Sequence, residues 1–67
     1  MMQEFLIEFS FQNNGRRKYR KESLWAENAQ EAVQEIRFRD DYYYVEPRVE
    51  KVWRLRNARL EETEAWE

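Results

Sequence analysis

Residues 4–11 read Glu-Phe-Leu-Ile-Glu-Phe-Ser-Phe, and this stretch decides the fold. Its large apolar side chains fall on every second position, at Phe5, Ile7, Phe9 and Phe11. A β-strand sends alternate side chains to opposite faces, so the spacing predicts a strand with one aromatic face and one mostly polar face. Because an uncovered aromatic face would promote aggregation, another layer must cover it. We expect a short helix to supply that layer.

A hairpin turn follows this strand at Asn13-Asn14-Gly15, because Asn and Gly tolerate the positive φ angles of tight turns. A loop of two residues would set the apolar side chains of the first strand opposite charged side chains of the second. A loop of three residues instead places Tyr19 and Trp25 on the aromatic face. Since a slip of one residue exchanges the two faces of a strand, we predict the three-residue loop and a second strand over residues 17–26.

A helix is predicted over residues 28–39. Asn28 is a favourable N-cap, and Glu31 three residues later completes a capping-box pattern. Apolar residues then recur at helical spacing and form one narrow stripe: Ala29, Ala32, Val33 and Ile36. Small residues let a helix lie close to a sheet with bulky side chains, so this stripe complements the phenylalanine face.

Residues 48–56 alternate between apolar and polar side chains, and we predict a third strand there; a helix is the competing interpretation. With a right-handed crossover, the third strand lies beside the first. The predicted fold class is therefore α+β: a three-stranded sheet in the order 2-1-3 with one helix packed on one face. Residues 1–56 form this ββαβ domain, and residues 57–67 form an acidic tail that is a helical turn or disordered.

The composition narrows the classes of function. The chain has 67 residues, no Cys, no His and a net charge of −2. A structural zinc site needs Cys or His ligands almost without exception, so we expect no metal and no cofactor. Without His or Cys as a base near neutral pH, we also expect no enzymatic activity and no catalytic residue. The sequence shows no secretory signal and no membrane span, so we expect a cytoplasmic protein.

Two groups of side chains are candidate contacts for a protein partner. Tyr42, Tyr43 and Tyr44 are adjacent, and neighbouring side chains of an extended chain diverge, so at least one ring should be exposed. Exposed Tyr is favoured at interfaces, although rings that cap the core explain the cluster equally well. The second group lies in the acidic tail: Glu61, Glu62, Glu64 and Trp66.

Basic residues gather at the predicted hairpin: Arg16, Arg17, Lys18 and Arg20. We expect Lys18 and Arg20 to project from the open face of the sheet, where they can contact phosphates. A structural explanation competes, because basic side chains also protect an edge strand from pairing with other sheets. The acidic net charge disfavours nucleic acid as the partner, so an RNA- or DNA-binding domain that uses the basic hairpin is the alternative function.

Residues 24–33, Leu-Trp-Ala-Glu-Asn-Ala-Gln-Glu-Ala-Val, resemble the junction between strand and helix in small ββαβ proteins. Such domains occur among ribosomal-type proteins and among short accessory proteins of phages and mobile elements, including anti-CRISPR inhibitors. From the acidic tail, the surplus Tyr and Trp and the small size, we predict a non-enzymatic protein-binding module. The resemblance suggests a phage-type inhibitor that blocks a functional surface of its target, for example a nucleic-acid-binding complex. A homodimer is also compatible with these features.

Overall fold

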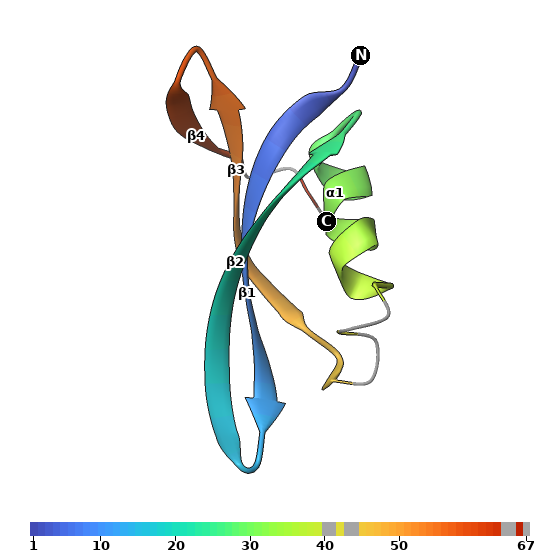
Figure 1. Ribbon diagram of the computed structural model, residues 1–67, viewed down its shortest axis with the longest axis vertical. Helices are drawn as coiled ribbons and strands as arrows, with labels where there is room; N and C mark the ends of the chain where they lie inside the picture. Colours follow the sequence, from blue (N-terminus) through green and yellow to red (C-terminus); the bar gives the residue numbers. More distant parts are fainter. Residues whose placement is uncertain (40–41, 43–44, 64–65, 67) are drawn as a thin grey trace.

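The computed structural model describes residues 1–39, 42, 45–63 and 66 (Figure 1). Its elements are β1 (Gln3–Asn13), β2 (Arg16–Ala26), α1 (Ala29–Arg37), β3 (Arg48–Arg56) and β4 (Arg59–Thr63). The strands form one antiparallel sheet in the order β2-β1-β3-β4. Helix α1 lies against one face of this sheet, and no described helix covers the other face.

Strand β1 is the centre of the core. Phe5, Ile7 and Phe9 are fully buried, as the alternation in residues 4–11 predicted. The small residues of α1 allow it to approach these rings closely, and Ala32 and Ile36 are fully buried as well. The prediction that an alanine-lined helix packs on the phenylalanine face is confirmed, and Tyr42 covers Phe9 and Phe11 beside it.

The predicted three-stranded sheet, with the order 2-1-3 and an acidic tail over residues 57–67, is wrong because β4 extends the sheet beyond β3. Asn57 and Ala58 form the turn between the two strands with positive φ angles of 51° and 60°. Ala rarely adopts this conformation, so the turn has no glycine signal in the sequence. In this hairpin Glu61 lies opposite Arg54, and opposite charges across two strands favour pairing.

The β1–β2 hairpin has a loop of two residues, not the three predicted. Asn14 and Gly15 have φ angles of 54° and 78°. Positive φ at both central positions gives a turn whose twist matches that of the flanking strands. The change of one residue in loop length exchanges the faces of β2. Tyr19 and Trp25, predicted to lie in the core, therefore point away from it and are exposed.

The short length of α1 explains why charged side chains can face the helix side of β2. The helix has nine residues, and Figure 1 shows the tip of the β1–β2 hairpin extending beyond it. Lys18 and Arg20, predicted on the open face, lie on the helix side opposite Phe11 and Phe9, and both stay exposed. Tyr42 covers these rings instead, with its ring centroid 4.8 Å from that of Phe9. Arg20 Nη1 donates a hydrogen bond of 3.4 Å to the Tyr42 hydroxyl.

The start of α1 follows the predicted N-cap. Asn28 has extended backbone, and its Oδ1 accepts a hydrogen bond of 2.8 Å from the Glu31 N–H. We expect Asn28→Ala to lower the free energy of unfolding by about 1 kcal/mol, because this N–H loses its acceptor. Urea unfolding measures the change. Gln30→Ala, at an exposed position of the same helix, is the control and should change stability by less than about 0.5 kcal/mol. Equal losses in the two variants would contradict the capping role.

Candidate functional site

The face of the sheet opposite α1, here called the open face, carries several large exposed side chains. The corrected register places Tyr19 and Trp25 of β2 on this face, and they are 62% and 58% exposed. Leu55 of β3 and Leu60 of β4 lie directly opposite each other and are also exposed. A contiguous group of exposed apolar side chains on one face marks a binding surface, whereas single scattered ones need no explanation.

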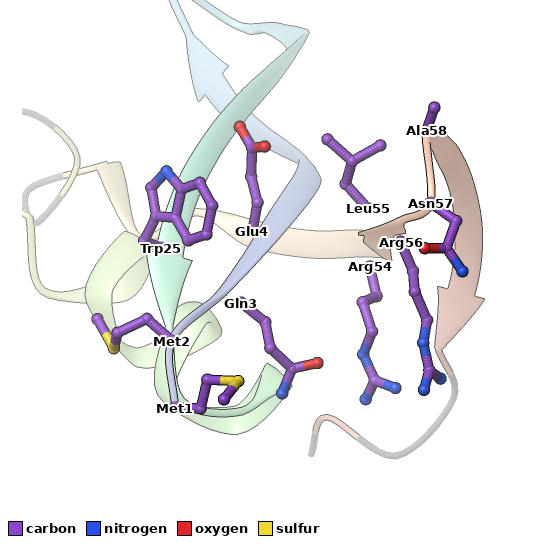
Figure 2. A pocket seen from close by; sticks show the side chains of 10 residues that line it. All are labelled: Met1, Met2, Gln3, Glu4, Trp25, Arg54, Leu55, Arg56, Asn57 and Ala58. Carbon is purple, nitrogen blue, oxygen red and sulfur yellow. The ribbon is translucent and has the colours of Figure 1, made fainter.

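A hollow of about 560 Å³, here called the terminal hollow, opens between the start of β1 and the turn that joins β3 to β4. Exposed apolar side chains form much of its wall: Met1, Met2, Trp25 and Leu55. Figure 2 shows that Arg54 and Arg56 point together to the opposite side of β3 from Leu55. The wall therefore combines apolar surface with two guanidinium groups.

Arg54 is held against the core. Its guanidinium carbon lies 5.9 Å from the centroid of the Phe5 ring, which is a cation–π contact. Its Nε is buried and has no hydrogen-bond partner among the described residues. A guanidinium group presents its N–H donors in a planar fork that matches a carboxylate. Arg54 and Arg56 thus give the terminal hollow a basic side suited to an acidic group.

A second hollow continues the apolar surface along the open face. It has a volume of about 190 Å³, and Leu6, Ser23 and Leu60 line it. It shares Glu4 and Leu55 with the terminal hollow, so the two hollows adjoin. Together they form one surface that extends across β2, β1, β3 and β4, and we call it the apolar end of the open face.

The hairpin end of the open face is polar and ordered by side-chain hydrogen bonds. Ser10 is fully buried; its Oγ accepts a hydrogen bond of 2.8 Å from Arg17 Nη1 and donates one of 2.8 Å to Glu50. Glu50 also lies 3.7 Å from Arg48 Nε. These bonds lie close to a register shift between Glu8 and Phe9, where β3 bulges against β1. The contacts hold Arg17 on the same face as Tyr19.

The candidate partner contacts from the sequence fall into several environments. Tyr42 is buried and belongs to the core. Glu61 and Glu62 are exposed on β4, and Trp66 is half-buried against the core cluster. The remaining candidates lie outside the described residues: Tyr43, Tyr44 and Glu64. The structure therefore does not gather the described candidates into one exposed site.

The four basic candidates are divided between the two faces of the sheet. Arg16 follows the turn, and Arg17 lies on the open face, where it donates to Ser10. Lys18 and Arg20 flank Tyr19 but face the helix side. All four remain exposed, so the positive charge surrounds the hairpin instead of covering one face.

The apolar end of the open face is not apparent from the sequence. Trp25 was assigned to the core through the wrong loop length, and Leu60 was assigned to a tail. The sequence carries no strand signal for Leu60, because residues 59–63, Arg-Leu-Glu-Glu-Thr, contain one apolar residue and no alternation. Arg54 was seen only as one polar position in the alternation of β3.

Comparison of the chain with protein-family models, curated proteins and solved structures gives no match. The resemblance to accessory proteins of phages and mobile elements therefore stays a prediction. Within the described part of the chain, no three acidic side chains lie close enough together to hold a metal ion. The one described helix is too short to span a bilayer. The geometry of the open face is thus the basis for assigning a function.

Proposed function

We propose that this protein is a non-enzymatic module that binds another protein through the apolar end of its open face. One observation carries this proposal: exposed apolar side chains gather around two adjoining hollows. Of the seven large apolar side chains exposed in the described part of the chain, five are there: Met1, Met2, Trp25, Leu55 and Leu60.

The composition of this surface matches the centre of a protein interface. Such centres are enriched in Trp, Met and Arg and depleted in acidic residues. Trp25 and Arg54 are of the two types that most often dominate binding energy. Full burial of a large apolar side chain contributes about 1.5–3 kcal/mol, so covering the half-exposed Trp25 and Leu60 contributes roughly 1 kcal/mol each.

The charges of the terminal hollow define the chemistry of the partner. Arg54 and Arg56 lie on one side of the hollow, and Glu4 is the acidic side chain that lines it. A partner segment that inserts apolar side chains over Trp25 and Leu55, and continues past the end of the sheet to the helix side of β3, would complement this arrangement by placing a carboxylate at the two guanidinium groups. The partner is therefore an apolar segment with an adjacent Asp or Glu.

The test is affinity capture from an extract of cells that express the gene naturally. We expect the tagged wild-type chain to retain a partner protein in stoichiometric amount. The double variant Trp25→Ser, Leu60→Ser should retain at least about 10-fold less, because it removes two of the exposed apolar contacts. Arg56→Gln should weaken retention and make it less sensitive to salt, because it removes one guanidinium group from the interface.

Phe38→Ser is the matched control. Phe38 is a large apolar side chain of similar exposure, 64%, but it lies at the end of α1 and not on the open face. It should retain the partner as well as the wild type does. Equal retention by the double variant and the wild type would refute the proposal. Treatment of the retained material with nuclease separates a direct protein contact from one mediated by nucleic acid.

A further inference from the structure

The hairpin end of the open face presents an aromatic ring between two basic side chains. Arg17, Tyr19 and Lys21 alternate along β2, so all three lie on the open face. Tyr19 is 62% exposed, and a hollow of about 320 Å³ lies beside it, lined also by Glu8, Arg20 and Lys21. The predicted loop length had placed Tyr19 in the core, away from the exposed basic groups. The observed register brings the ring and the charges together.

A second aromatic ring continues this arrangement toward the centre of the sheet. Lys21 Nζ lies 5.5 Å from the ring centroid of Trp53 in β3. This cation–π contact fixes Lys21 over the sheet, between Tyr19 on the same strand and Trp53. The surface therefore presents, one after another, the Tyr19 ring and the Lys21 ammonium group of β2 and the Trp53 ring of β3.

The positive charge at this end is largely free of compensation from the described acids. Glu22 pairs with Arg39 of the helix side at 3.2 Å, and Glu50 is engaged by Ser10 and Arg48. The remaining described acids of the hairpin are Glu8, which is half-buried opposite Lys21, and Glu4, which lies at the other end of β1. The net charge of −2 thus hides a basic hairpin, because other acids lie on α1 and β4.

We infer that the hairpin end of the open face binds single-stranded nucleic acid, with a base stacked on Tyr19 and neighbouring phosphates at Arg17 and Lys21. A basic surface with exposed aromatic rings is the combination that single strands require, because bases stack on the rings while cations contact the backbone. A duplex fits less well, since its bases are stacked on each other and do not offer their faces.

This site goes beyond the proposed protein-binding function and uses different residues. Tyr19 and Trp25 are six residues apart on β2, which corresponds to roughly 20 Å along a strand. A short oligonucleotide can therefore occupy the hairpin end while a protein segment occupies the terminal hollow. The two proposals can succeed or fail separately.

Fluorescence anisotropy with fluorescein-labelled dT6 and rU6 tests the inference on the full chain. We expect both single strands to bind at 50 mM salt. With two phosphates contacted, affinity should fall about 7-fold between 50 and 200 mM salt. Tyr19→Ala should weaken binding about 5- to 150-fold through the loss of one stacked base, and Tyr19→Phe should bind like the wild type.

Three further measurements make the outcome decisive. Lys21→Ala should weaken binding and reduce its salt dependence, whereas Phe38→Ala should change neither. The double variant Trp25→Ser, Leu60→Ser should bind the oligonucleotides like the wild type. Absence of binding at 50 mM salt would overturn the inference. The inference would also be overturned if Tyr19→Ala bound with the same affinity as the wild type, or if a duplex of the same length bound more tightly. Either result would show that the protein binds any polyanion.

Discussion

Phe9→Ala is expected to lower the free energy of unfolding by about 3–5 kcal/mol. Phe9 is fully buried at the centre of β1, where its ring contacts those of Phe11 and Tyr42 at centroid distances of 6.4 Å and 4.8 Å. Removing it leaves a cavity between the sheet and the segment that covers it. At this length, total stability is about 3–10 kcal/mol, so the variant should be largely unfolded.

Circular dichroism and urea unfolding measure this loss, and Phe38→Ala provides the control. Phe38 is 64% exposed, so its removal should change stability by less than about 0.5 kcal/mol. Tyr42→Phe is a second control, because it keeps the aromatic contact with Phe9 and removes only the long hydrogen bond from Arg20. A loss below about 1 kcal/mol in Phe9→Ala would mean that this ring does not hold the core together.

The features that the sequence predicts correctly depend on short-range signals. The alternation in residues 4–11 reflects the burial of one face of β1, and the N-cap at Asn28 depends on a side chain and a backbone N–H three residues apart. Residues 48–56 were likewise predicted as a strand and form β3. Each of these signals is complete within one segment, so no knowledge of the remaining chain is needed.

The predictions from sequence are wrong where contacts between segments distant in the chain determine the structure. The three-residue loop of the β1–β2 hairpin is favoured only if a covering layer spans the whole of β2, so that Tyr19 must lie inside. The helix is too short for that, and Tyr42 covers Phe9 and Phe11 instead. The turn at Asn57 and Ala58 forms β4 without a glycine, so its acids suggested a tail.

The candidate sites follow from these two corrections and could not be predicted without them. Leu55 and Leu60 are separated by a turn and become neighbours only when β4 pairs with β3. Trp25 reaches the terminal hollow only in the two-residue register of the hairpin. Tyr19 joins Lys21 on the open face for the same reason. A residue that the alternation pattern assigns to the core can therefore become an exposed binding residue when the strand register differs from the predicted one.

Leu24→Ser and Trp25→Ser, at adjacent positions of β2, should differ sharply in their effects on stability. In the two-residue register Leu24 faces α1 and is buried, whereas Trp25 lies on the open face and is 58% exposed. Leu24→Ser should lower the free energy of unfolding by about 2–5 kcal/mol, because it removes a buried side chain and adds an uncompensated hydroxyl. Trp25→Ser should cost less than about 1 kcal/mol.

The comparison distinguishes the two registers directly, because a three-residue loop would exchange the environments of these two residues. Urea unfolding of both variants, measured side by side, gives the result without any partner or ligand. A larger loss for Trp25→Ser than for Leu24→Ser would place Trp25 in the core. In that case the apolar end of the open face would lose its central aromatic ring and Tyr19 would leave the hairpin end, so both proposed binding surfaces depend on the order of these two effects.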